Sequence, residues 1–456
     1  MMRYAVSIKR FFLLLLLLLL SGSLLFALDW GGSVTNSTQY ETQEEESDDD
    51  EFYQENTLSL YLSTPIGAKS EFAADAAYTY TTDRAFLLEL RQAHVTRSVE
   101  PEAGPTQFQT RVGRFSSADP TGEVLRHTLD GIRLGFSFPA VDLELTAGYT
   151  GFLLQPSASV SLSKLDQAED EDEEFFAPSR LVGQIAASMP ELFLGQNLEV
   201  ALLFQEDLRN PDSGDLIEPG EDTLQPTQGG LVDTQYAVVS LDGPIQGNLF
   251  YTVYGIANTG RTLSFVEDQD SATGEVYEYR PFLAGLFGLQ LDYFMPGFLS
   301  SRASLFGRLG TGDEDYSSYT EGNTDGKATH FTPITALSAG EVFGIEPGNS
   351  AHLGVSYSVR PFAASPNGWL KRLQGELSAY SFFRTAGKGV TSVSAVDSGT
   401  DETYLGSEFD FALRARPYSD FGIGLTTGLF VANSSALFDE ANEVDFLVRL
   451  DASLSF

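Results

Sequence analysis

The sequence of 456 residues contains no cysteine, and its 27 basic residues are far outnumbered by 64 acidic ones. Without cysteine the chain has no disulfides, no thiolate metal sites and no lipid-modified N-terminal cysteine. The formal net charge of −37 argues against nucleic acid or anionic lipid headgroups as partners, because both would be repelled. Such acidity often accompanies disorder, but 34 phenylalanines and 19 tyrosines are too many for a disordered chain.

A long apolar run occurs only near the start, within residues 1–27. It follows three basic residues and ends in small ones, the pattern of a secretory signal peptide cleaved after Ala27. A retained membrane helix is the alternative, but the run is short and a polar, strand-like sequence follows it directly. No later run is long enough for a spanning helix. We therefore predict a signal peptide, residues 1–27, and an exported all-β domain, residues 28–456.

The exported part alternates between apolar and polar residues with a period of two, in segments about ten residues long. In "DGIRLGFSF", Ile132 and Leu134 share one face and Arg133 takes the other. The final stretch, "EVDFLVRLDASLSF", keeps this alternation up to Phe456. We predict eighteen strands, with sixteen as the alternative, near residues 28–40, 53–63, 70–80, 86–97, 106–115, 129–138, 141–152, 179–189, 197–207, 231–241, 247–258, 278–294, 300–310, 350–361, 372–385, 403–415, 420–432 and 443–456.

Connection lengths distinguish a membrane barrel from a soluble sandwich, which would show the same alternation. Short turns alternate along the chain with long polar stretches, at 41–51, 153–178, 208–230, 259–276, 311–349, 386–402 and 432–443. Short periplasmic turns and long outer loops are typical of a transmembrane barrel. Both termini on the periplasmic side require an even number of strands, so we interpret 311–349 as one long outer loop, partly folded inward. The predicted fold is a closed antiparallel transmembrane β-barrel.

Backbone N–H and C=O groups cannot stay unpaired in lipid, so the sheet must close into a barrel. Its apolar residues then face lipid and its polar residues face a lumen, which is too wide for side chains to fill. The same register predicts which charged residues line the pore and set its selectivity. Cross-strand pairing of opposite charges that only solvates the wall is the competing interpretation. The candidates are Glu89, Arg91, Arg111, Arg133, Asp142, Glu144, Arg308, Arg360, Arg384, Glu408, Asp410, Arg414 and Arg449.

Residues 116–128 form the third outer loop in this count. Asp119 and Pro120, followed by Thr121, have the chemistry of a helix start, and Arg126 is a further pore-lining candidate. This loop either constricts the channel or lies on the surface.

The acidic runs 44–51 and 169–174 also fall in outer loops. They either bridge divalent ions at the cell surface or are solvated charges that favour cations at the pore mouth.

No catalytic motif is present: the four histidines form no metal-ligand cluster, and nucleophile-elbow, dinucleotide and Walker patterns are absent. We therefore expect no enzyme and no cofactor. A catalytic site assembled from distant strands would escape this test.

The whole chain resembles a bacterial outer-membrane porin in its signal peptide, alternating strands, uneven loops and C-terminal aromatic residue. Residues 404–435 are similar to the end of the alginate-export and related substrate-specific porins, with matches at Gly406, Glu408, Asp410 and Phe430. The segment "FTPITALSAGEVFG" resembles their inward-reaching loop. The mixed charges on the wall depart from the basic lumen that export of a polyanion implies, so no alginate substrate is inferred.

This resemblance implies a passive channel for small hydrophilic solutes in the outer membrane of a Gram-negative-type envelope, of undetermined oligomeric state. A surface receptor or adhesin that uses the acidic loops is the alternative. The expected partners are outer-membrane lipid, solutes and the outer-membrane assembly machinery, for which the terminal Phe456 resembles the recognition signal. We also predict that the last strand pairs with residues 28–40 to close the barrel.

Overall fold

A computed structural model describes residues 28–42, 51–151, 160–163, 166, 180–208, 230, 232–267, 275–316, 318–322, 327–438 and 443–456. These residues form one antiparallel sheet of eighteen strands. The strands are β1 (Asp29–Glu41), β2 (Glu51–Pro65), β3 (Ser70–Thr81), β4 (Leu87–Val99), β5 (Gln107–Ala118), β6 (Arg126–Ser137), β7 (Asp142–Tyr149), β8 (Arg180–Phe193), β9 (Gln196–Asp207), β10 (Val232–Gln246), β11 (Leu249–Glu267), β12 (Glu275–Met295), β13 (Ser301–Gly310), β14 (Ala351–Val359), β15 (Gln374–Phe383), β16 (Tyr404–Ala415), β17 (Phe421–Ala432) and β18 (Val444–Ser455).

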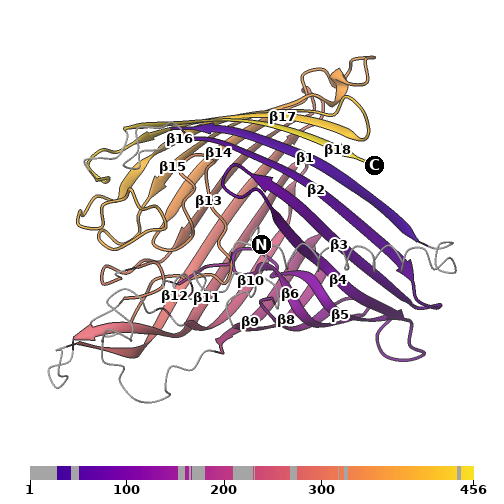
Figure 1. Cartoon of the computed structure of the whole chain (residues 1–456), viewed down its shortest axis with the longest axis horizontal. Helices are drawn as coiled ribbons and strands as arrows, with labels where there is room; N and C mark the ends of the chain where they lie inside the picture. Colours follow the sequence, from indigo (N-terminus) through magenta and orange to yellow (C-terminus); the bar gives the residue numbers. More distant parts are fainter. Residues whose placement is uncertain are drawn as a thin grey trace, which may run out of the picture.

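The sheet closes on itself through β1 and β18, which lie side by side in Figure 1. Ser33 stands opposite Ser455, and Glu41 stands opposite Leu447. Gly32 and Phe456 exchange two backbone hydrogen bonds, both 2.9 Å long. Closure leaves no strand edge with unpaired N–H and C=O groups, as a hydrocarbon environment demands. The predicted pairing of the last strand with residues 28–40 is therefore confirmed.

All eighteen predicted strands are present, but one predicted loop is wrong. Residues 259–276 are mostly strand, because β11 continues to Glu267 and β12 begins at Glu275. Side-chain pairing across the sheet supports this extension. The guanidinium of Arg261 lies 4.4 Å from the ring centroid of Tyr279, and its Nε is 2.7 Å from Asp233. The charged residues of this segment suggested a loop in the sequence, but their side chains interact with side chains on the neighbouring strands.

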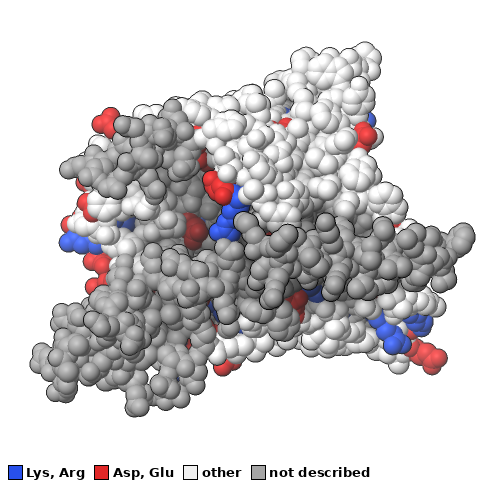
Figure 2. Space-filling view, viewed as in Figure 1, with Lys and Arg blue, Asp and Glu red and all other residues white. Residues whose placement is uncertain are grey.

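The outer wall of the barrel carries the apolar half of each strand. Side chains such as Leu202, Leu377 and Leu450 are more than half exposed although they are aliphatic. In Figure 2 the described wall at the upper right is largely uncharged, and charged side chains are seen at the left and right ends and beside the middle of the view. Among the described residues, no helix has the length and apolar character needed to cross a membrane. A band of this kind matches the lipid-facing surface of a membrane barrel.

The two ends of the barrel differ as the connection lengths predicted. Long connections such as those after β13 and β15 gather at the left end of Figure 1, and short turns gather at the right end. By the usual arrangement of such barrels, the short-turn end faces the periplasm. The longest turn there joins β14 to β15 and contains a short 3₁₀ helix, η1 (Leu370–Arg372). The predicted signal peptide and the acidic runs 44–50 and 169–174 lie outside the described residues.

Candidate permeation pathway

Two outer loops turn inward and meet inside the barrel: the β5–β6 loop (119–125) and the β13–β14 loop (311–350). The carbonyl oxygen of Val124 accepts the N–H groups of Ile334 and Thr335, at 3.0 and 2.9 Å. The hydroxyl oxygen of Thr335 accepts the N–H of Arg126 at 2.6 Å. The prediction that the long loop folds partly inward is confirmed. The shorter loop also lies inside the barrel and not on the surface, so the two loops together narrow the lumen.

The expected helix start at Asp119 is not a helix. The Asp119 carboxylate instead accepts the N–H groups of Thr121, Gly122, Val124 and Leu125, at 2.8, 3.2, 2.9 and 2.8 Å. The residue types that satisfy free N–H groups at a helix start also satisfy those of a tight loop, so the sequence pattern was ambiguous. One buried carboxylate thereby fixes the shape of the whole loop.

Arg308 on β13 ties the two loops together. Its Nη1 donates to the Glu123 carboxylate at 3.0 Å and to the carbonyl of Leu337 at 2.8 Å, and its Nη2 donates to the carbonyl of Ile345 at 3.2 Å. Glu123 also accepts a 2.7 Å hydrogen bond from the hydroxyl of Tyr254 on β11. Arg308 is only 5% exposed. Charge-assisted bonds at a buried site make this arginine the main link between the loops and the wall.

Glu408 on β16 holds the far end of the long loop. Its carboxylate accepts the N–H groups of Glu341, Val342 and Phe343, at 2.5, 3.1 and 2.8 Å. Arg449 on β18 adds a 2.7 Å ion pair with Glu341. The long loop therefore crosses the lumen from β10, where the Tyr236 hydroxyl donates to the loop, to β16 and β18.

Apolar side chains beneath the loops form two lumen cores, which the prediction of a uniformly polar lumen missed. The first joins loop residues such as Phe331 and Ile334 to wall residues such as Leu203 on β9. In the second, the ring of Phe343 stacks on Phe430 of β17 with centroids 4.3 Å apart. Inward apolar residues are stable here because the loops cover them. Only the uncovered part of the wall can contact solute.

A buried histidine marks the outer part of the long loop. His330 stacks on Tyr316 with ring centroids 4.5 Å apart and meets Tyr319 edge-on at 5.1 Å. Neither ring nitrogen has a hydrogen-bond partner in the described part of the chain. Burial lowers the pKa of His330 to about 3 and raises the pKa of the nearby Glu346 carboxyl. The packed loop therefore requires a neutral His330.

The central cavity, of about 460 Å³, lies between the loops and the wall from β13 to β17. It is lined by Glu123, Phe306, Arg308, residues 337–341, His352, Glu376, Ser378, Tyr380, Asp410, Ala412, Arg414 and Thr426. Three of its four carboxylates have arginine partners. Glu123 pairs with Arg308 at 3.0 Å, Glu341 pairs with Arg449 at 2.7 Å, and Glu376 lies 3.7 Å from Arg414.

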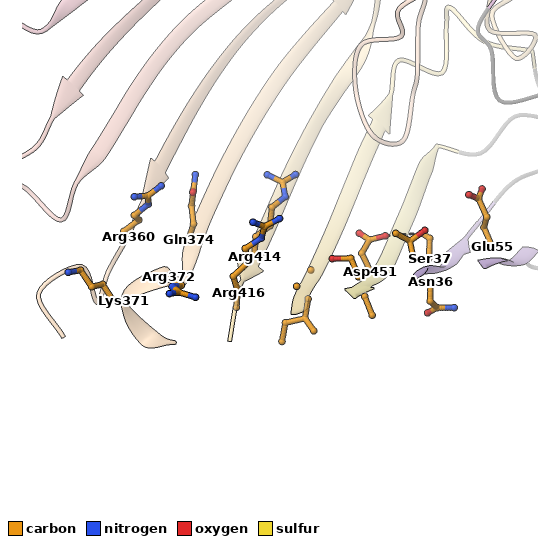
Figure 3. A pocket seen from close by; sticks show the side chains of 17 residues that line it. Asn36, Ser37, Glu55, Arg360, Lys371, Arg372, Gln374, Arg414, Arg416 and Asp451 are labelled. Atoms are coloured by element: carbon orange, nitrogen blue, oxygen red, sulfur yellow. Dashed lines mark hydrogen bonds between the residues drawn. The ribbon is translucent and has the colours of Figure 1, made fainter. Parts of the chain in front are cut away.

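The vestibule cavity, of about 900 Å³, lies at the short-turn end and shares Arg414 with the central cavity. Figure 3 shows its basic side chains together at the left, from the β14–β15 turn, β16 and the turn after β16, and Asp451, Ser37 and Glu55 farther along the same wall at the right. The charged lining residues are Arg360, Lys371, Arg372, Arg414 and Arg416, with Glu55 and Asp451 as the acids. Basic residues therefore dominate this cavity in a chain with a strong acidic excess.

The predicted basic row on β4 to β6 is held by neighbouring polar groups. Arg111 stands directly opposite Arg133. Arg91 donates to Ser59 at 3.0 Å, and Arg111 donates to Thr96 at 3.1 Å. Arg133 lies 3.2 Å from Glu144. The row exists as a geometric feature, and its pairing with Glu144 also fits the competing interpretation of a solvated wall.

The remaining candidates have different surroundings. Glu89 lies 3.6 Å from Arg91. Asp142 and Glu144 line a third cavity of about 330 Å³. Arg126 is exposed at the start of β6.

Arg384 lies just past β15 at the loop end and is fully buried. Its guanidinium donates to the carbonyls of Asp397, Thr400 and Glu402, at 2.9, 2.7 and 2.7 Å. It thereby orders the β15–β16 loop.

Sequence reasoning missed Glu123, Glu341, Lys371 and Arg372 as residues of the pathway. Lys371 and Arg372 lie in a turn, where the two-residue period gives no direction for a side chain. Glu123 and Glu341 lie in loops whose inward path depends on contacts far along the chain. The only sequence feature that could have identified Glu123 and Glu341 is that each is a charged residue in a segment predicted to fold inward.

No protein-family model matches this chain, and no curated protein sequence matches it. Solved structures do. Pseudomonas aeruginosa OccK8 (OprE) aligns with a TM-score of 0.57 at 10% identity, covering 94% of this chain and 98% of that one. OccK2 (OpdF) of the same organism, solved in complex with glucuronate, aligns with a TM-score of 0.55 at 10% identity, with the same coverages.

The outer membrane protein opdK from Pseudomonas aeruginosa aligns with a TM-score of 0.54 at 12% identity, again over 94% and 98% of the two chains. Identities this low show the fold alone. That fold is the closed eighteen-strand barrel of bacterial outer-membrane porins, which confirms the porin resemblance at the level of architecture. The narrower likeness to alginate-export porins stays a prediction.

Proposed function

We propose that the chain is an outer-membrane channel for passive diffusion of small hydrophilic solutes. The observation that carries this proposal is a pair of charged cavities in series, the central cavity and the vestibule cavity, which share Arg414. The central cavity lies between the inward loops and the wall, and the vestibule cavity lies against the wall at the short-turn end. A charged, water-accessible path of this kind suits hydrated solutes, and its charges set which solutes pass.

The vestibule cavity supports a preference for solutes that carry a carboxylate at this end. Five basic side chains line it, against two acidic ones. Arginine and lysine bind carboxylates by charge-assisted hydrogen bonds. Glucuronate is the first solute to test, because a structural neighbour was solved with it bound.

Conductance in planar bilayers tests the proposal. Purified barrel that has passed a heat-modifiability check should give discrete conductance steps, and the absence of steps would overturn the proposal. Liposome swelling should be faster with glucuronate than with uncharged glucose. Changing Lys371 and Arg372 to Gln should reduce that difference. Lys69→Gln is the matched control, because Lys69 is an exposed cation on another turn at the same end and does not line the cavity.

The alternative function, a surface receptor or adhesin, rests on acidic runs that lie outside the described residues except for Glu51. No described contact favours it. Deleting 44–51 and 169–174 addresses it directly, since an adhesin would lose binding while any conductance persisted.

A further inference from the structure

Asp410, on the inward face of β16, is a buried carboxylate without a partner. Its side chain is 7% exposed, and neither oxygen has a hydrogen bond in the described part of the chain. Asp410 is one of the residues that line the central cavity. An isolated buried carboxylate is costly, so such a group either holds a proton or is compensated by a nearby positive charge.

The neighbouring carboxylates do have hydrogen-bond or ion-pair partners. Glu408 lies two residues away on the same face, and three backbone N–H groups occupy its oxygens. Each of the other three carboxylates of the cavity has its own arginine. The arginines around the cavity thus pair with the other three carboxylates and leave Asp410 without an ion pair in the described part of the chain.

The cross-strand neighbours of Asp410 carry neutral hydroxyl oxygens rather than charged side chains. Ser378 stands directly opposite it on β15, within about 5.5 Å between Cβ atoms for such a pair. Gly428 stands opposite on β17, and a Cβ there would come 2.9 Å from an Asp410 oxygen. The same Cβ would come 2.5 Å from Cγ2 of Val342, so only a glycine lets the long loop pack beside the carboxylate here. Thr426 and Tyr380 add hydroxyl groups to the lining.

We propose that Asp410 is a binding subsite for a monovalent cationic group, either an inorganic cation or the ammonium group of a permeating solute. The carboxylate supplies the charge, and the hydroxyls of Ser378, Thr426 and Tyr380 supply neutral oxygen ligands. The subsite rests on the proposed channel function and names a chemistry for its central cavity. It differs from the vestibule cavity, where basic groups prevail.

Ion selectivity and block measure the subsite. In a potassium chloride gradient, the potassium-to-chloride permeability ratio of Asp410→Asn should fall by about threefold or more relative to wild type, since one unpaired charge is removed from a narrow site. Methylammonium added to potassium chloride should reduce wild-type current and leave Asp410→Asn current nearly unchanged. Asp410→Glu, which keeps the charge, should retain both properties.

Two outcomes distinguish an inorganic cation from an ammonium group as the ligand. A selectivity change without methylammonium block assigns the site to inorganic cations, and block with a selectivity change assigns it to ammonium groups as well. Unchanged selectivity together with unchanged block in Asp410→Asn overturns the inference, because Asp410 would then be a neutral carboxyl. A wild-type chain that gives no conductance at all would overturn the channel proposal instead.

Ser378→Ala carries the test if Asp410→Asn fails to fold. It removes one oxygen and no charge, so methylammonium block should weaken by about two- to tenfold, the loss of one hydrogen bond of ordinary strength. Block of wild-type strength in Ser378→Ala would contradict the subsite.

Discussion

Arg308 is the residue on which the two inward loops most depend. Its guanidinium has three partners from both loops, and Glu123 would lose its cation without it. Breaking a buried ion pair from one side leaves the other charge uncompensated, at about 3–5 kcal/mol. We predict that Arg308→Met lowers the thermal stability of the folded barrel and increases single-channel conductance, because the loops detach.

Arg302→Met provides the control for this change. Arg302 lies on the same strand, is 37% exposed and stands 3.8 Å from Asp292. An exposed pair of this kind contributes little, about 0–1 kcal/mol. Equal effects of the two substitutions on the melting temperature and conductance would show that Arg308 has no special role.

His330 gives the long loop a dependence on pH. Its pKa is about 3 in the packed loop, against an ordinary value of 6.5, so packing favours the neutral ring. The stabilising effect is complete above pH 6.5 and is lost as pH falls toward 3, by about 1.4 kcal/mol per pH unit. The hydrogen-exchange protection factors of residues 327–350, which are corrected for the intrinsic pH dependence of exchange, should therefore fall as pH is lowered from 6.5 to 5.

The substitution His330→Phe isolates this effect from other titrations. Phenylalanine keeps the stack on Tyr316 and has no ring nitrogen to protonate. The variant should lose this fall in protection, while the titration of Glu346 continues as in wild type. The same acid response in both proteins would rule out His330 as its source.

Among the elements, the strands could be predicted and the loops could not. Each strand carries its own evidence, a two-residue alternation that lipid on one side and polar surroundings on the other impose locally. The pairing of β1 with β18 followed from the requirement that the sheet close, since the first and last strands are the two that consecutive pairing leaves with a free edge. Where charged residues interrupt the alternation, at 259–276, the prediction failed.

The loops were unpredictable because their conformations depend on distant residues. Arg308 meets Glu123 from 185 positions away along the sequence, and Glu408 accepts N–H groups of the long loop from 65 to 67 positions away. Nothing local distinguishes Glu408, which fixes a loop, from Asp410, two residues on, which faces the cavity. Alternation placed both inward and could not assign their roles.

Docking of the long loop on β16 is testable through Glu408. Glu408→Gln keeps the size of the side chain but offers one acceptor oxygen for the three N–H groups that the carboxylate satisfies. We predict faster hydrogen exchange at residues 341–343 and a rise in current noise. Glu376→Gln, a wall carboxylate that bonds no loop N–H in the described chain, should leave exchange at 341–343 unchanged.

For the whole molecule, the order of the two cavities matters more than the net charge. The central cavity holds the unpaired carboxylate of Asp410, and the vestibule cavity at the short-turn end is predominantly basic. In the proposed channel, cations and anions would therefore meet favourable fixed charges at different depths along the path. A voltage that drives both kinds of ion toward their favourable ends should concentrate them in the channel, and the opposite voltage should deplete them.

We accordingly predict that the channel rectifies, passing more current at one polarity than at the other when the salt is equal on both sides. Neutralising the vestibule with Lys371→Gln and Arg372→Gln should bring the current ratio at opposite voltages toward one. Lys69→Gln should leave the ratio unchanged. Raising the salt from about 0.1 M to about 1 M should also weaken rectification, because the Debye length falls from about 10 to about 3 Å. A symmetric current in wild type at low salt would refute the charge order as a functional feature.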